Sequence, residues 1–223
     1  MQISQTSVNS LLISFGEVIS QDISQKVQNG FNAIMKLNDE AIYEIIPSYT
    51  TIFLSFDIFK YNFFSIKNSL KKIITNYIPT HTIDDDDIID IDVCYDISYG
   101  LDLKQISKTK NITIDEIVAI HTKNIYYVYA LGFLPGFGFL GLVDDAIATP
   151  RLKSPRKKVL KGSVGIADNQ TAVYPQDSAG GWNIIGQTKH KLFDETKEAL
   201  SPLGIGKKVK FNAIPKQLFE TQV

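Results

Sequence analysis

Residues 132–141 read GFLPGFGFLG, and this stretch decides between two classes of fold. Gly136, Gly138 and Gly141 match the G-x-G-x-x-G pattern of dinucleotide-binding proteins, directly after the strand-like run YYVYALGF. That pattern needs an amphipathic helix to begin at the glycines, because the pyrophosphate rests on the helix N-terminus. Only LVDDAIAT separates Gly141 from Pro150, and no Gly-Lys-Ser/Thr triplet ends a Walker loop. We therefore expect a turn leaving a strand, with Phe133, Phe137 and Phe139 near a pocket or partner.

The residues that follow are rich in turns. Residues 132–188 hold nine of the fourteen glycines, four of the eight prolines, the only tryptophan and both arginines. Short strand-like segments lie between or just beyond these turns: YYVYALGF, SVGIA, TAVYP, GWNIIGQT and KKVKFNAI. Short strands with frequent Gly and Pro turns favour a small barrel or sandwich over a parallel α/β sheet. Two short helices are expected before them, LDLKQISKT and one beginning at TIDE, where Thr113 and Glu116 form a capping box.

The first ninety or so residues have a different texture. Strands are expected at SLLISF, AIYEII, YTTIFLSF and IIDIDVCYD, and apolar residues at helical spacing predict helices over 20–37 and around 63–77. The order βαββαβ is the ferredoxin-like arrangement. The sequence therefore predicts an α+β protein with a ferredoxin-like domain over residues 1–96 and a second, barrel-like domain over residues 97–223.

Composition excludes several classes of partner. The formal net charge of -1 gives no reason to expect nucleic acid or an anionic membrane. No apolar window approaches about 18 residues, and the N-terminus lacks the pattern of a signal peptide. Cys94 is the only cysteine, so no intrachain disulfide forms, which fits a reducing compartment. We expect a soluble, cytoplasmic protein.

The usual catalytic and metal-binding motifs are missing. The three histidines form no H-x-H or H-x-x-x-H pair, so no zinc ligand set exists, and a G-x-S-x-G elbow is absent. The run of four aspartates at 84–87 lacks the glycine and distal glutamate of a calcium loop and is expected to be a solvated acidic loop. His121 lies near apolar helix positions, which favours a packed, hydrogen-bonded histidine over a catalytic one. Cys94 shares a strand face with Asp90 and Asp92, whose charge would raise its pKa. We expect no metal site.

Two positions draw attention by residue type. Only two of the 23 basic residues are arginines, Arg151 and Arg156, five apart in PRLKSPR. A planar guanidinium binds carboxylate, phosphate or backbone carbonyls with several donors, so these positions either bind an anion or brace a loop.

In SAGGW, Gly180 and Gly181 either expose backbone N–H groups to an anion or form a tight turn before Trp182.

Together, GFLPGFGFLG, PRLKSPRKKVLKGSVGIADNQTAVYP and SAGGWNIIGQT resemble the family called allophanate hydrolase subunit 1 or the 5-oxoprolinase B subunit, also named for a histidine-kinase inhibitor. YGLDL, TIDEIVAIHT and SLLISFGEVI fit the same family in order. The resemblance implies an N-terminal ferredoxin-like domain and a C-terminal cyclophilin-like β-barrel. The chain departs from the family pattern at Leu152, Leu160, Ala179 and Gln187, which bears on substrate specificity more than on fold.

The resemblance also implies an activity. Family members act with a homologous C subunit and a separate A subunit in the ATP-dependent opening of 5-oxoproline to L-glutamate, with Mg as the expected companion of ATP. On this basis the isolated chain is expected to be inactive. Three alternatives remain open: a regulatory protein that inhibits a sensor histidine kinase by docking through GFLPGF, a component of allophanate or urea amidohydrolase metabolism, and, on barrel analogy only, a prolyl isomerase. No residue is assigned to the chemical step, and the following are expected to bind substrate or partner: Pro135, Gly136, Phe137, Arg151, Arg156, Gln170, Thr171, Tyr174, Gly180, Trp182 and Gln187.

Overall fold

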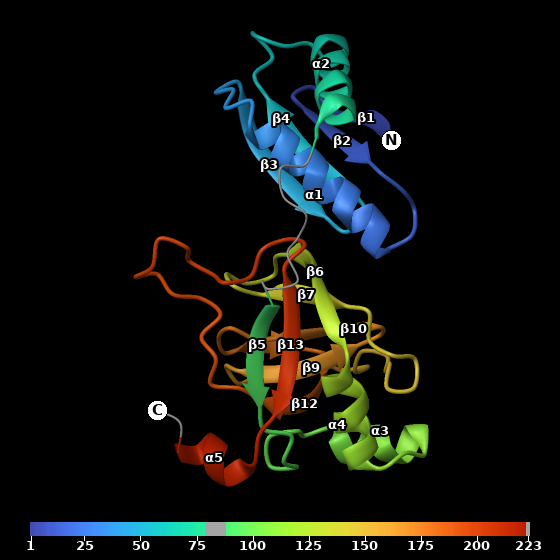
Figure 1. The fold of residues 1–223 in the computed structure, drawn as a ribbon, viewed down its shortest axis with the longest axis vertical. Helices are drawn as coiled ribbons and strands as arrows, with labels where there is room; N and C mark the ends of the chain where they lie inside the picture. The colour runs from blue at the N-terminus through green and yellow to red at the C-terminus, as the bar shows by residue number, and fades with distance from the viewer. Residues whose placement is uncertain (79–87, 222–223) are drawn as a thin grey trace. The chain divides into compact units, whose positions relative to one another are not determined.

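The computed structural model describes residues 1–78 and 88–221. It divides into two compact units, Met1–Asp84 and Asp85–Val223, which are treated separately below (Figure 1). The aspartate run at 84–87 and His81 lie outside the described residues. Within the described residues, no helix is long and apolar enough to cross a membrane.

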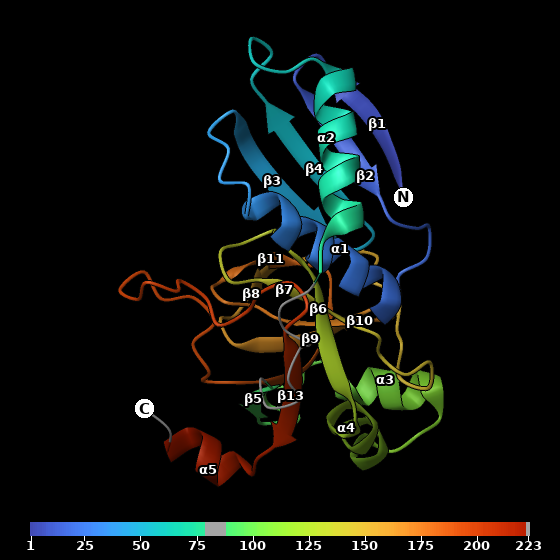
Figure 2. The same ribbon diagram turned by 45° about the horizontal axis from the view of Figure 1, so that its top comes forward.

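The first unit is an antiparallel sheet with two helices against it. Its strands are β1 (Gln2–Ser7), β2 (Ser10–Ser14), β3 (Ile42–Ser48) and β4 (Thr51–Phe56), in the order β1-β2-β4-β3. Helices α1 (Gln21–Met35) and α2 (Phe63–Asn76) run side by side next to this sheet (Figures 1 and 2). The helices begin where the sequence offers caps, because the Ser20 side chain accepts from the Ile23 N–H and Asn62 forms a capping box with Ser65.

The predicted βαββαβ order is wrong at both ends. Strand β1 precedes the first predicted strand, and β5 (Ile88–Val93) pairs in parallel with β13 (Lys208–Ala213) of the second unit. The predicted boundary at residue 96 therefore lies inside the second unit. Alternation of apolar and polar residues identified β5 as a strand, but its partner lies more than a hundred residues away, and local periodicity carries no information about such pairing.

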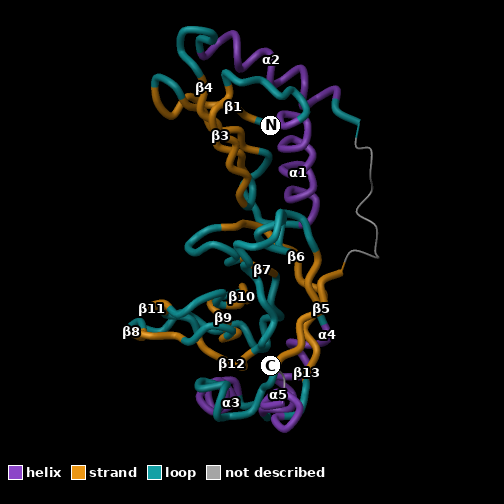
Figure 3. The backbone as a smooth tube through the Cα atoms, turned by 90° about the vertical axis from the view of Figure 1, so that its left-hand side faces the viewer, coloured by secondary structure: helices purple, strands orange, loops and turns teal. Residues whose placement is uncertain are grey.

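The second unit is built on one antiparallel sheet in the order β5-β13-β6-β7-β10-β9-β12, parallel only between β5 and β13. Its remaining elements are α3 (Leu103–Lys110), α4 (Ile114–Lys123), β6 (Ile125–Leu131), β7 (Gly138–Gly141), β8 (Arg156–Val159), β9 (Ser163–Ala167), β10 (Gln170–Val173), β11 (Ser178–Gly180), β12 (Asn183–Gln187) and α5 (Lys216–Thr221). Strands β8 and β11 form a separate pair, which Figure 3 shows beside the main sheet.

The two ends of this sheet meet. Directly after β5, the Cys94 N–H donates to the Gln187 carbonyl at 2.8 Å, and the Gln187 N–H donates back to the Cys94 carbonyl at 3.0 Å. Closure of a sheet on itself is the arrangement that a small barrel requires. The mixed α+β class is therefore confirmed, whereas the ferredoxin-like and cyclophilin-like names remain predictions.

GFLPGFGFLG is a turn followed by β7, which pairs with β6 on one side and β10 on the other. No helix begins at Gly141, so the structural context of a dinucleotide fingerprint is absent from this stretch. The predicted turn is confirmed. The capping box at Thr113 and Glu116 is confirmed as well, at the start of α4.

Candidate functional site

The turn after β6 rests on a cluster of aromatic rings. The Phe137 ring lies edge-on to those of Phe133, Tyr174 and Trp182, with centroid distances of 5.2, 5.4 and 5.7 Å. Phe137, Tyr174 and Trp182 are 2%, 1% and 5% exposed, so they form the interior of the site rather than its surface. Edge-on aromatic contacts of this kind fix ring orientation as well as burying area. The structure therefore brings together three predicted site residues, Phe137 from one part of the chain and Tyr174 and Trp182 from another.

Gly136 has a structural reason to be glycine. Its φ of 80° lies in the left-handed region, and a Cβ there would come within 2.5 Å of the Leu192 carbonyl oxygen. The Phe137 N–H donates to the Leu134 carbonyl at 2.9 Å, and the Gly132 N–H donates to the Phe137 carbonyl at 3.2 Å. The turn itself therefore uses these two donors, and the role of Gly136 in binding stays a prediction.

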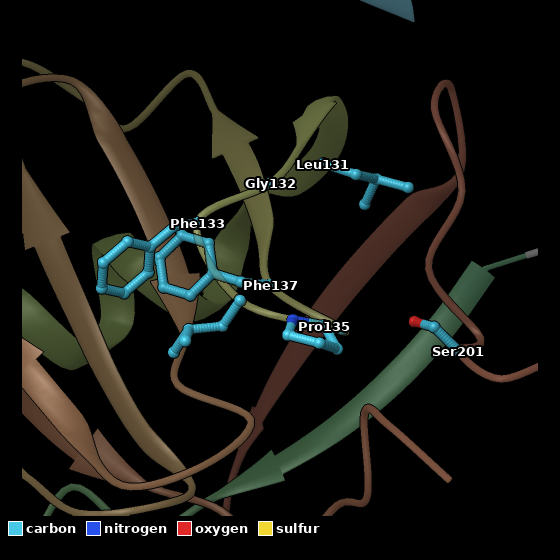
Figure 4. Close-up of a pocket in the computed structure, with 8 residues that line it drawn as sticks. Leu131, Gly132, Phe133, Pro135, Phe137 and Ser201 are labelled. Carbon is cyan, nitrogen blue, oxygen red and sulfur yellow. The ribbon is translucent and has the colours of Figure 1, made fainter. Parts of the chain in front are cut away.

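An open groove of about 440 Å³ runs along this turn (Figure 4). Its only side-chain hydroxyl is that of Ser201, while Phe133 and Leu131 on its wall are 61% and 42% exposed. An ionised group placed here would lose hydration without a charged partner from the lining, so the groove suits an apolar group. The residues that line it are Leu131, Gly132, Phe133, Leu134, Pro135, Gly136, Phe137 and Ser201.

Arg156 braces the site from inside. Its Nη2 donates to Asp102 Oδ1 at 2.6 Å, and its Nη1 donates to the Trp182 carbonyl at 3.3 Å. The second oxygen of the Asp102 carboxylate accepts the Ile184 N–H at 2.6 Å. One carboxylate and one guanidinium thus hold both Trp182 and the start of β12, the strand that follows it. Of the two roles left open for Arg156, the structure shows the bracing one.

Asp102 was missed by sequence reasoning. It is the second residue of the expected helix LDLKQISKT, yet in the structure it precedes α3, its side chain makes no capping hydrogen bond, and the residue as a whole is 7% exposed. An aspartate carboxylate is rarely buried to this extent without a cationic partner. The one signal in the sequence was its place in YGLDL, a segment shared with the family.

Arg151 differs from Arg156 in its exposure to solvent and in its hydrogen bonding. It is exposed, and within residues 1–78 and 88–221 its guanidinium makes no hydrogen bond or ion pair. Its backbone is nevertheless fixed on both sides, because Asn183 Nδ2 donates to the Pro150 carbonyl at 2.8 Å and the Leu152 N–H donates to the Gly181 carbonyl at 2.7 Å. A well-anchored backbone therefore presents a free cation.

Tyr174 and Gly180 fit closely together. A Cβ at Gly180 would come within 2.3 Å of the Tyr174 hydroxyl, so only glycine lets β11 pass over the ring. Burial raises the pKa of Tyr174, whereas a hydrogen bond from the Trp182 backbone and the charges of Arg151 and Arg156 act in the opposite direction. The phenol of Tyr174 therefore stays neutral near pH 7, although the charges of both arginines act on it.

Thr171 lies in the core, where it belongs to a buried polar chain. Its hydroxyl donates to the Gly165 carbonyl at 3.0 Å, so the oxygen must accept the Nε2–H of His121, also at 3.0 Å. Nδ1 of His121 then accepts from the Tyr95 hydroxyl at 2.8 Å. A histidine that donates from Nε2 cannot take a proton from Thr171, so this pair is not a nucleophile and its base. The predicted packed and hydrogen-bonded His121 is confirmed, with no exposed surface.

Two further residues of the predicted set are Gln187 and Gln170. Gln187 donates from Nε2 to the Lys161 carbonyl at 2.8 Å, which holds a turn. Gln170 opens β10 opposite Gly141 and stays a prediction as a binding residue. Cys94 is buried, and that burial raises its pKa, rather than the charges of Asp90 and Asp92 as expected. Among the described residues, no group of three or more His, Cys, Asp or Glu side chains is placed to hold a metal ion.

Comparison with known proteins places this chain in a family. Residues 1–203 match the model of the carboxyltransferase domain, subdomain C and D. The chain is 34% identical to the B subunit of the 5-oxoprolinase of Bacillus subtilis over 220 residues, 94% of this chain and 91% of that protein. The crystal structure of TTHA0988 aligns with a TM-score of 0.82 and 29% identity over 93% of this chain, which spans only 40% of that longer chain.

The urea amidolyase of Kluyveromyces lactis shows the same fold at 15% identity, with a TM-score of 0.75 over 98% of this chain and 15% of that one. At that identity the likeness concerns fold alone. The family model and the near full-length relative agree with each other. This chain therefore belongs to the carboxyltransferase-domain family represented by the 5-oxoprolinase B subunit, also called allophanate hydrolase subunit 1.

Proposed function

We propose that this chain is one component of an ATP-dependent 5-oxoprolinase, which opens 5-oxoproline to L-glutamate together with a homologous C subunit and a separate A subunit. The observation that carries the proposal is the identity to a 5-oxoprolinase B subunit, which extends over nearly the full length of both chains. The proposal includes a cytoplasmic location, where the buried thiol of Cys94 stays reduced.

The substrate chemistry explains why ATP is part of the proposal. 5-oxoproline is a five-membered lactam with one carboxylate, and its amide carbonyl is a poor electrophile for water. In this proposal ATP would transfer its terminal phosphoryl group to the oxygen of this carbonyl and leave as ADP, and water would then open the ring with release of inorganic phosphate. A site for such a reaction must hold the carboxylate, present the lactam and keep competing water away.

The residues of this chain fit only part of that task. Arg151 offers a free guanidinium, and the cluster of Phe137, Tyr174 and Trp182 forms a rigid wall. The sequence has no Walker loop, and the hydrogen-bonded pair of His121 and Thr171 is buried in the core, closed to a substrate. In this proposal the nucleotide and its Mg are therefore held with the partner subunits, and the isolated chain is inactive.

A second function is favoured by one observation, the apolar groove along GFLPGF. Phe133, 61% exposed on its wall, offers a docking surface for another protein such as a sensor histidine kinase. A third alternative, action on allophanate or another urea-derived amide, is supported only by the fold shared with urea amidolyase.

Reconstitution separates these alternatives. The chain is co-expressed with homologues of the C and A subunits from the same organism, and ADP release is measured with 5-oxoproline, with allophanate and without substrate. The proposal predicts release that depends on 5-oxoproline and on the presence of this chain. An assembled complex that turns over allophanate alone, or binds a histidine kinase and hydrolyses neither substrate, refutes it in favour of the corresponding alternative.

A further inference from the structure

The two arginines of PRLKSPR have different roles, and the structure separates them. Both guanidinium donors that Arg156 uses are directed inward, to the Asp102 carboxylate and to the Trp182 carbonyl. Its side chain is 26% exposed and that of Asp102 is 10% exposed, so the pair is largely closed to solvent. A ligand anion would have to compete with Asp102 for the same donors. Arg156 is therefore a brace and not a binding group.

Arg151 is the guanidinium that remains. The loop carrying it is fastened on either side, through the carbonyl of Pro150 and the N–H of Leu152. The anchoring groups belong to Asn183 and Gly181, which lie in the same segment as Trp182. The guanidinium is thus presented from a fixed backbone in the segment next to Trp182, so on binding only the arginine side chain has to be ordered.

The charges around this loop favour an anion. Residues 150–161 carry six basic residues and no acidic one. Arg156 and Lys158 are paired with Asp102 and Asp177, whereas Arg151 and Lys153 have no ion pair among the described residues. The acidic side chains that contact this segment are thus already occupied. The positive potential is left for a ligand, and Arg151 is the group in the loop with two parallel donors.

We infer that Arg151 binds the carboxylate of a small ligand at the surface formed by residues 150–155 and the Gly180–Gly181 backbone, while Arg156 positions Trp182 beside it. A carboxylate matches one guanidinium in both charge and geometry, since two oxygens sharing one negative charge meet two parallel N–H groups. That the carboxylate is the one on 5-oxoproline rests on the proposed function. The division of roles between the two arginines does not.

The chain contains its own reporter for this site. Trp182 is the only tryptophan, its carbonyl is held by Arg156, and its neighbour Gly181 is bonded to the loop that carries Arg151. The intrinsic fluorescence of the purified full-length chain is titrated with 5-oxoproline, with the neutral amide of 5-oxoproline and with inorganic phosphate. Saturable binding of 5-oxoproline is expected, with the amide weaker by about tenfold or more, the usual loss of one hydrogen bond to a charged group.

Variants locate the binding group. Arg151→Gln is expected to weaken 5-oxoproline binding by about tenfold or more, and Arg151→Lys by less, because lysine keeps the charge and loses the fork. Lys153→Gln is the matched control, since it removes the same charge from the same loop and should change the affinity by less than about twofold under physiological salt. Arg151 has no partner in the described residues, so its variants should fold normally, which circular dichroism checks.

The inference is overturned if Arg151→Gln binds 5-oxoproline like the wild type, or if Lys153→Gln loses as much affinity as Arg151→Gln. It is also overturned if phosphate binds more tightly than 5-oxoproline, or if neither fluorescence nor NMR spectra show a saturable response to 5-oxoproline. The same variants in the reconstituted complex separate this inference from the proposed function. Binding through Arg151 without turnover refutes the activity alone. Turnover with an unchanged KM in Arg151→Gln refutes the inference alone.

Discussion

His121 should make the stability of the second unit depend on pH in a range where carboxylates do not titrate. Its imidazole is neutral, with the proton on Nε2, because Thr171 must donate to the Gly165 carbonyl and Nδ1 accepts from Tyr95. Protonation of Nδ1 would break the bond from Tyr95 and leave a charge in the core. Burial accordingly lowers the pKa of His121 from 6.5 to about 3.

The sign and size of the effect follow from proton linkage. Below pH 6.5 the unfolded chain binds a proton at this residue and the native chain does not, so the free energy of unfolding falls as the pH falls. Between about pH 7.5 and about pH 5.0 the loss is about 2 kcal/mol, and any native pKa below about 4 gives the same figure. Stability continues to fall until the pH reaches the native pKa of about 3.

The assay is urea unfolding followed by Trp182 fluorescence, which reports on the second unit alone, at the two ends of this pH interval. His121→Gln, whose amide both donates and accepts, should lose about 2 kcal/mol less than the wild type over this interval. His190→Gln is the comparison: the His190 side chain makes no hydrogen bond within the described residues, but burial lowers its pKa too, so this variant should reduce the pH dependence by less than His121→Gln does. Equal pH dependence in the wild type and His121→Gln, or an NMR titration of His121 at the ordinary pKa of a histidine, would refute the reasoning.

Two more substitutions test the packing of the site by the same unfolding assay. Gly180→Ala should cost about 1–3 kcal/mol, because its Cβ would lie 2.3 Å from the Tyr174 hydroxyl, whereas Gly181→Ala, with its nearest atom at 3.7 Å, should cost much less; equal losses would contradict the close fit. Asp102→Ala should cost about 3 kcal/mol or more, because it leaves the guanidinium of Arg156 without its carboxylate. Lys158→Ala breaks an exposed pair and should cost less than about 1 kcal/mol, so a similar loss in both variants would show that Asp102 is no special brace.

Local features of the fold were predictable from the sequence. The strands from SVGIA and TAVYP, the capping box at Thr113 and the turn at GFLPGF all follow from patterns within about ten residues, and all are observed. The pairing of β5 with β13 was not predictable in the same way, because a strand's period identifies its faces and not its neighbour. The predicted βαββαβ grouping failed at that step.

In the candidate site, too, some residues could be predicted from the sequence, whereas their roles could not. Residue type alone singled out Arg151, Arg156 and Trp182, since rare residues in a lysine-rich, turn-rich region attract attention. Which arginine is free depends on Asp102, 54 positions away from Arg156, and no spacing rule links them. Thr171 was expected at a pocket and lies in the core, because its strand is covered on the side that it faces. Conformation and charge pairing, rather than composition, decide these roles.

The central claim is tested most directly by measuring L-glutamate and ADP formed from 5-oxoproline and ATP by the three reconstituted subunits. The two products should appear together, and omission of this chain should abolish both. If wild-type chain restores product formation at limiting 5-oxoproline and Arg151→Gln does not, the activity depends on the inferred binding group. Glutamate formation at an unchanged rate without this chain, or an assembled complex that forms no glutamate, would contradict the claim.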